Sequence, residues 1–143
     1  MSQFSIGGLT SAGSSTLPIF SLYAGATARG VIREIGVFNT TAVAVSLKLS
    51  RLDTAGTKPA ALTDGEWDQE GPPALCTAHL THTVGPTIDE ELKRVSLGAA
   101  IGSGIIWTFG GRGLIVPLGV ANGIGLVPIG TGQVCDAYVE WEE

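Results

Sequence analysis

The 143-residue sequence predicts an all-β protein: a single-domain antiparallel β-sandwich or jelly roll with a flexible N-terminal arm. Two observations carry this prediction. The chain holds 21 glycines, while its charged residues are 15% of the total, well below the roughly 25% of an average soluble protein. Its apolar segments read as roughly eight or nine short strands at about 8 to 12 residue spacing, as in sandwiches and jelly rolls.

The N-terminal segment, residues 1–16, is MSQFSIGGLTSAGSST. It is rich in Ser, Gly and Thr, and such a segment buries too little apolar surface to become ordered alone. We therefore expect residues 1–16 to form the flexible arm and residues 17–143 to form the β-sandwich domain, whose apolar residues begin at LPIFSLY (17–23).

The most regular pattern follows, and it predicts a hairpin. Residues 28–38 place Val31, Ile35 and Val37 on one face with Arg33 among them, and Asn39, Thr40 and Thr41 turn the chain. Beyond this turn, apolar residues alternate with small or polar ones, which is the period of a half-buried strand. The apolar positions are Val43, Val45, Leu47 and Leu49.

Five more strands are predicted in the second half of the chain, at residues 92–99, 104–109, 113–117, 123–128 and 134–142. Turns that contain glycine separate them. The last strand alternates cleanly, with Cys135, Ala137, Val139 and Trp141 on one face. The only predicted helix is a turn or two at IDEEL (88–92), with Thr87 as its cap.

Residues 51–74 form an excursion that is longer than an ordinary hairpin loop. Four acids alternate in it at positions 64, 66, 68 and 70, but the glycine and glutamate positions of an EF-hand hold other residues. We interpret it as an acidic, solvated loop. Trp67, flanked by these charges, is a candidate anchor for a partner surface, with folding back onto its own core as the alternative.

Signatures of catalysis are scarce. The three G-x-G pairs lack a third glycine at the dinucleotide-binding spacing, and no GxxxxGK[ST], HExxH or GxSxG occurs. Cys76, His79 and His82 form the one metal-like cluster. On a strand, steps of three alternate between faces, so His79 would point away from the other two. We expect a buried cysteine, two surface or loop histidines, no metal, no cofactor and no enzyme activity.

The charge, the cysteine content and the long uncharged segments limit the partners and the cellular compartment that we expect. The net charge of −5 gives little basis for binding nucleic acid. The chain has two cysteines and begins without a signal-peptide pattern, which predicts synthesis in a reducing cytoplasm. Residues 113–135 are long enough to cross a bilayer, but Pro117, Pro128 and six glycines make a continuous helix poor. We therefore expect no membrane association.

Two stretches resemble small structural proteins of tailed-bacteriophage virions. The first is the early hairpin that ends in Arg51 and Leu52 and is followed by Thr54, Gly56 and Thr57. The second is LIVPLGVANGIGL (114–126), with the closing acidic strand AYVEWEE (137–143). The resemblance covers about half of the chain, and the acidic insertion around Trp67 departs from it.

This resemblance implies a jelly-roll protein that decorates or cements a capsid, made in the host cytoplasm and located on the virion surface. The implied partners are the major capsid protein and further copies of the chain, with a trimer favoured because closed symmetry covers exposed strand edges. The candidate contact residues are Trp67, Asp68 and Glu70 in the acidic loop and Phe4 and Ile6 in the arm. We expect residues 1–16 to act as an attachment arm that becomes ordered on a neighbouring subunit. Deleting these residues without loss of particle binding would refute this role.

Two alternatives belong to other classes. One is a carbohydrate- or receptor-binding module of a phage fibre or tail, with Trp67, Trp107 or Tyr138 as stacking platforms. The other is a cupin-like enzyme on a similar double-sheet fold, which requires clustered histidine and carboxylate ligands. Trp107 and Trp141 fit strand patterns that would bury them.

Overall fold

A computed structural model describes residues 1–143, and all of its regular elements are β-strands. The strands are β1 (Gln3–Leu9), β2 (Phe20–Tyr23), β3 (Gly30–Asn39), β4 (Val45–Leu52), β5 (Gly65–Glu66), β6 (Thr77–His79), β7 (Ile88–Leu97), β8 (Gly104–Thr108), β9 (Leu114–Val116), β10 (Gly123–Pro128) and β11 (Cys135–Glu142). None of its segments is a helix long and apolar enough to span a membrane.

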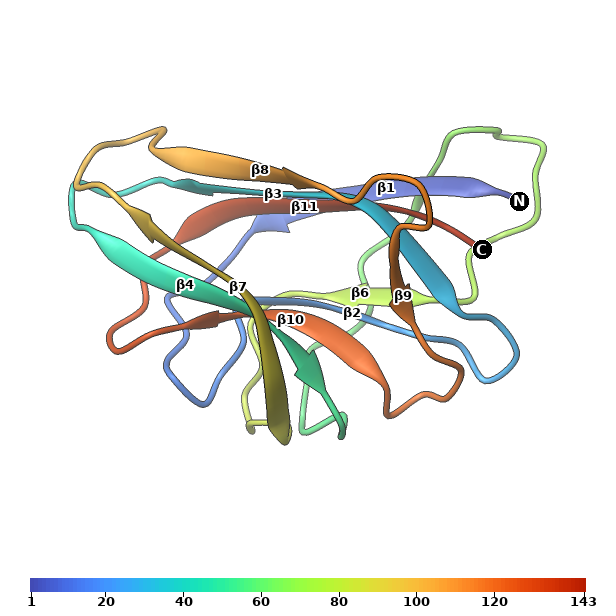
Figure 1. Ribbon diagram of the computed structural model, residues 1–143, viewed down its shortest axis with the longest axis horizontal. Helices are drawn as coiled ribbons and strands as arrows, with labels where there is room; N and C mark the ends of the chain where they lie inside the picture. The colour runs from blue at the N-terminus through green and yellow to red at the C-terminus, as the bar shows by residue number, and fades with distance from the viewer.

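The strands form two antiparallel sheets packed face to face, which confirms the predicted sandwich (Figure 1). Sheet I has the order β5-β1-β11-β3-β8, with β9 also paired to β3, and sheet II has the order β6-β2-β10-β4-β7. When the short β5, β6 and β9 are left out, eight strands remain. The first pairs with the eighth (β1·β11), the second with the seventh (β2·β10), the third with the sixth (β3·β8) and the fourth with the fifth (β4·β7). This is one long hairpin wrapped into a jelly roll.

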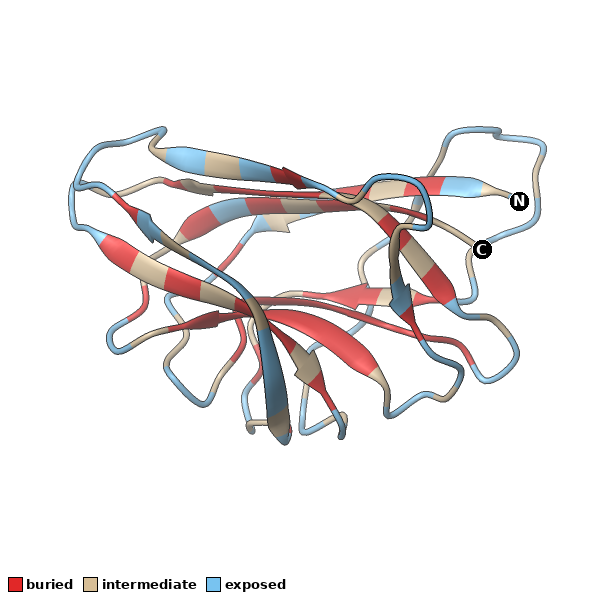
Figure 2. Cartoon of the chain, viewed as in Figure 1, coloured by how far each residue is buried: buried red, intermediate tan, exposed pale blue.

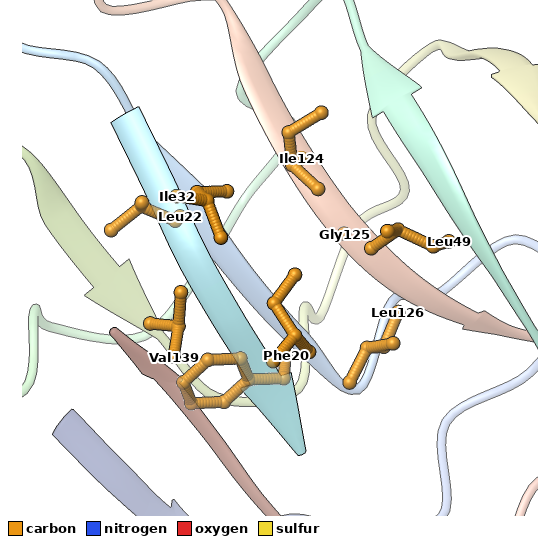
Figure 3. Close-up of a pocket in the computed structure, with 9 residues that line it drawn as sticks. Phe20, Leu22, Ile32, Leu49, Ile124, Gly125, Leu126 and Val139 are labelled. Carbon is orange, nitrogen blue, oxygen red and sulfur yellow. The ribbon is translucent and has the colours of Figure 1, made fainter. Parts of the chain in front are cut away.

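The core lies between the two sheets: buried residues alternate with less buried ones along β4 and β11, while every residue of β2 and β10 is buried (Figure 2). Figure 3 shows side chains from both layers meeting there, among them Phe20, Ile32, Leu126 and Val139. The remaining cavity is about 10 Å³ and its lining is almost entirely apolar. Buried polar partners that would hold a ligand are missing from it, so we read it as a packing gap in the core.

The alternating patterns on both sides of Asn39 are confirmed for Ile35, Val37 and the residues of β4, but the predicted hairpin between them is wrong. Val45, Leu47 and Leu49 are buried, while Val43 lies exposed in the connection. However, β3 belongs to sheet I and β4 to sheet II. The two strands face each other across the core, since each has one apolar face that must be buried.

The connection between the sheets is held by the buried Asn39. Its Nδ2 donates to the carbonyl oxygens of Val43 (2.7 Å) and Gly98 (3.2 Å). Its Oδ1 accepts from the backbone N–H and the hydroxyl of Thr41, each at 3.0 Å. These side-chain hydrogen bonds stabilise the β3–β4 connection, whose two strands are not hydrogen-bonded to each other as they would be in a hairpin.

The flexible arm is a second correction. Residues 3–9 form β1, which pairs with β11 over its whole length and with β5 on its other side. Phe4 and Ile6 are buried, and the Phe4 ring stacks on Trp141 with centroids 5.3 Å apart. One aromatic and one aliphatic side chain, at alternate positions, bury enough apolar surface to order a segment whose average composition is polar.

Two local predictions also differ from the structure. Residues 88–92 belong to β7, which pairs with β4 across two register shifts, and not to the predicted helix. Thr87 is therefore not a helix cap, and its backbone N–H donates to Thr54 Oγ1 at 2.7 Å. In β3, Ile32 rather than Val31 points into the core. A β-bulge opposite Glu140 and Trp141 adds one residue to β3 and so reverses the face of its first residues.

Candidate interaction surfaces

The acidic loop presents Trp67 to solvent. The residue follows β5 directly, its backbone N–H donates to Gln3 O at 3.1 Å, and 60% of its surface is exposed. Asp68 and Glu70 are exposed beside it, in a turn where Asp68 Oδ1 accepts from the Glu70 N–H. These three residues are exposed to solvent, whereas Phe4 and Ile6 are core residues and are inaccessible to a partner.

The outer face of sheet I carries a feature that the sequence analysis missed. Gly36 of β3 lies opposite Tyr138 of β11, and the Tyr138 ring occupies the space that a Cβ at Gly36 would need. Gly104 of β8 stands in the same relation to the Phe38 ring. Two aromatic rings therefore lie flat on the sheet over glycines.

Exposed aliphatic side chains flank these rings. Ile106 pairs with Gly36 and is 50% exposed, and Leu9, which pairs with Asp136, is 59% exposed. We call the surface formed by Leu9, Phe38, Ile106 and Tyr138 the aromatic face. The only sequence signal for it is an outward-facing glycine on each of two strands, which pairing places beside an aromatic residue of the adjacent strand.

Carboxylates border the aromatic face. Glu34 and Glu140 are directly opposite each other on β3 and β11. The Tyr138 hydroxyl donates to Glu34 Oε1 at 2.5 Å, and burial together with this hydrogen bond raises the pKa of Tyr138 to about 12. Partial burial, and secondarily the charge of Glu34, raise the pKa of Glu140. Opposed like charges destabilise a sheet, so this pair is locally unfavourable in the isolated chain.

A pocket of about 90 Å³ lies where the acidic loop meets sheet I. Trp67, Gln3, Arg33, Glu140 and Glu142 line it, together with the buried Phe4 and Trp141. Glu142 is fully engaged: Arg33 Nη2 donates to its Oε2 at 2.7 Å and Gln3 Nε2 to its Oε1 at 2.9 Å. These bonds lower the pKa of Glu142.

The two histidines lie together on the outer side of sheet II, and both are buried. His79 is a strand residue of β6, contrary to the prediction of a surface or loop position, whereas His82 lies in the loop that follows β6, as predicted. Their rings lie 6.1 Å (His79) and 6.0 Å (His82) from that of Tyr23. Pro59 O and Thr77 Oγ1 bind the ring nitrogens of His79, at 2.8 and 2.9 Å. Cys76 points into the core instead, so His79 points away from it, as predicted. The prediction that His79 also points away from His82 is wrong, because His82 lies beyond the end of β6, where strand alternation no longer sets its direction.

His82 is incompletely satisfied. Its Nε2 is 2.9 Å from Ser21 Oγ, while its Nδ1 is buried without a partner. Burial lowers its pKa to about 4, and the neighbouring His79 and Lys58 contribute. The pair therefore holds a neutral imidazole against a serine hydroxyl beneath a loop, and it lacks a carboxylate that would orient the ring for nucleophilic catalysis.

The geometry does not favour metal binding or a reactive thiol. No group of three or more His, Cys, Asp or Glu side chains is arranged to hold a metal ion. Cys76 and Cys135 are free and buried, and burial raises their pKa values to about 12 and about 11. Thiols with pKa values this high are weak nucleophiles at neutral pH.

Of the three aromatic residues considered as sugar platforms, Trp107 points into the core. Trp67 and Tyr138 remain accessible. Burial of Trp107 and Trp141 follows the predicted strand patterns.

Comparison with known protein families and with curated proteins finds no match to this chain. Among solved structures, it is similar to the globular domain of zebrafish complement 1qA protein, with a TM-score of 0.36 and 8% identity over 98% of this chain and 95% of that one. It is also similar to the extra small virus (XSV) VLP of the giant freshwater prawn Macrobrachium rosenbergii, with a TM-score of 0.30 and 9% identity over 99% of this chain and 80% of that one. Both scores are low, so the fold assignment depends on this chain's own strand order.

Proposed function

We propose that this protein is a structural component of a bacteriophage virion, a decoration or cement protein that binds the outer surface of the capsid shell and stabilises it. In this proposal the partners are the major capsid protein and further copies of the chain, with a trimer favoured. The chain is made in the host cytoplasm and has no catalytic role.

The observation that carries the proposal is the aromatic face. Protein interfaces are enriched in aromatic residues at their centres, and flat sheet surfaces pack well against a neighbouring subunit. Phe38 and Tyr138 are held rigidly over glycines, so they lose little side-chain freedom on association. The jelly-roll topology is compatible with a shell protein, since viral capsid domains are among those that use it, but it is shared with lectins and cupins.

The test is the copy number of this chain in purified virions, measured by quantitative mass spectrometry against the major shell protein. The proposal predicts hundreds of copies in each particle. A few to a few tens of copies would indicate a tail, portal or fibre role, and absence from virions would overturn the proposal.

A second candidate function is a carbohydrate- or receptor-binding module of a phage fibre or tail. It is favoured by one observation, the exposed Trp67 beside a pocket lined by amide and carboxylate groups. Stacking on an aromatic ring with polar groups around it is a common arrangement for a small ligand. Binding on a glycan array that Trp67→Ala abolishes would support this alternative, and uniform silence would count against it.

A further inference from the structure

The pocket between Trp67 and Glu140 has an unbalanced charge. The structure contains three ion pairs, and none of them includes Glu140. Arg33 is the only cation in the lining, and it is already engaged by Glu142 Oε2 at 2.7 Å and by Gly111 O at 3.0 Å. One carboxylate in the pocket therefore remains uncompensated, with Glu34 opposite it on the neighbouring strand.

The other wall of the pocket is aromatic. Trp67 is the most exposed of the three tryptophans, and its backbone is fixed by the hydrogen bond to Gln3 O and by the pairing of β5 with β1. Indole is the side chain that attracts cations best through its ring face. An exposed indole on a fixed backbone, in the same pocket as a carboxylate outside any ion pair, forms a site for a positively charged group.

The dimensions limit the ligand. A volume of about 90 Å³ has room for several water molecules and therefore for an ammonium or guanidinium head group, but not for a folded peptide segment. The charge on one side and the ring on the other favour a side chain that inserts its cationic end.

We propose that this pocket binds a lysine or arginine side chain of a protein partner, with the cation against the Trp67 ring and paired with Glu140. The inference rests on the proposed function only in assigning that side chain to a protein, which on a virion would be the shell protein. A cation there relieves the repulsion between Glu34 and Glu140, so part of the binding energy comes from a strain already present in the free chain.

The experiment titrates the isolated protein with blocked tripeptides, Gly-Arg-Gly and Gly-Lys-Gly, with Gly-Gln-Gly as the neutral probe. The readout is the indole N–H resonance of Trp67 in ¹H–¹⁵N NMR spectra. We expect both basic peptides to shift this resonance in a saturable, salt-sensitive way at millimolar concentrations, and the neutral peptide to leave it unchanged.

Variants assign the contacts. Glu140→Gln keeps the size of the side chain and removes its charge, and we expect it to weaken binding about fivefold or more, judged by the tryptophan resonance. Trp67→Leu, followed through the backbone resonances of Gln3 and Glu142, should weaken binding to a similar extent. Asp136→Asn is the matched control, because this exposed acid lies on the same strand as Glu140 but outside the pocket lining, and its affinity should stay within about twofold.

Equal shifts with the neutral peptide, unchanged affinity in Glu140→Gln, or no shift with any probe at tens of millimolar would each overturn the proposal. The virion measurement fails or succeeds independently. A chain abundant on virions that binds no basic peptide disproves the pocket assignment alone, and a chain absent from virions that binds these peptides disproves the virion role alone.

Discussion

At the residue scale, His82 is the side chain whose environment departs most from its ordinary state. It is 1% exposed, its Nδ1 has no partner, and the groups around it are His79, Lys58, Tyr23 and Ser21, none of which is an anion. A proton on this ring would place a positive charge in a buried cluster beside Lys58. The cluster is therefore stable only with a neutral imidazole.

This environment predicts a loss of stability in mild acid. The unfolded chain takes up the proton near pH 6.5, whereas the folded chain does so near pH 4, so unfolding becomes more favourable as the pH falls between these values. We expect the unfolding free energy to fall by about 2–3 kcal/mol because of His82 as the pH decreases through this range. Above the range His82 causes no loss of stability, and below it His82 causes no further loss.

Urea unfolding at several pH values between 7.5 and 4 measures this effect. His82→Gln retains a donor near Ser21 but does not titrate, so its stability should depend less steeply on pH than that of the wild type. The comparison also removes the contributions of Asp53, Asp64 and Glu140, whose raised pKa values act in the opposite direction in both proteins. Parallel pH profiles for the two proteins would show that His82 is not the responsible group.

Asn39 stabilises the connection between β3 and β4 through several side-chain hydrogen bonds. Its amide binds two carbonyl oxygens and accepts two hydrogen bonds from Thr41 within the β3–β4 connection. We expect Asn39→Ala to lower the unfolding free energy by about 3 kcal/mol, because several buried backbone groups lose their partners. Thermal and urea denaturation check this, with the exposed Ala42→Ser as control. A loss below about 1 kcal/mol would mean that water replaces the amide.

At the element scale, β1 and β11 show how the ends of the chain complete the fold. The last strand, β11, lies between β1 and β3 at the centre of sheet I, so the sheet cannot be completed until the whole chain is present. Because β1 is an interior strand of this sheet, removing residues 1–16 would expose the edge of β11 and the core behind it. The proposed deletion would thus test folding rather than attachment.

The burial of β1 can be tested within that single strand. Phe4→Ala removes a ring that is stacked on Trp141, and we expect a loss of about 3–5 kcal/mol in unfolding free energy. Leu9→Ala is the matched control, since Leu9 lies on the same strand and is 59% exposed, and its effect should stay within about 0.5 kcal/mol. Urea unfolding followed by tryptophan fluorescence measures both. A similar, small effect for the two variants would indicate a detached N-terminal segment.

At the scale of the whole molecule, the two outer surfaces of the sandwich differ. Loops cover the outer side of sheet II at Tyr23, His79 and His82, while the outer side of sheet I has the aromatic face in contact with solvent. If the protein forms a trimer or contacts a shell, the aromatic face is the surface we expect to be covered.

A charge placed on that face should disrupt assembly without unfolding the chain. We expect Ile106→Asp to reduce the molar mass measured by light scattering from that of an oligomer to that of a monomer, because a carboxylate beside Tyr138 must be desolvated at the interface. Val84→Asp, at an exposed residue outside the aromatic face, is the control and should retain the oligomer. Circular dichroism confirms folding. A wild-type chain that is monomeric at all concentrations would contradict the predicted trimer.

The fold class, the positions of the strands β8 to β11 and the inward faces of β4 and β11 could be predicted from the sequence. Alternation along a strand is a local property: each residue's face depends on its position relative to its neighbours. For Trp67 the sequence left two outcomes open, an anchor for a partner or a residue folded onto its own core, and the structure shows the side chain exposed. For the candidate site, sequence reasoning therefore reached one wall of the pocket and missed Glu140, the other.

What the tertiary structure alone decided concerns residues far apart in the chain. The partners of β1, the sheets to which β3 and β4 belong, the bulge that turns Ile32 inward and the burial of both histidines all depend on which surfaces become covered. So does the meeting of Trp67 with Glu140 and of Tyr138 with Gly36. The sequence by itself determined which side of β4 and β11 is apolar, since that depends on local periodicity, whereas strand pairing is decided by how all the apolar faces are buried together.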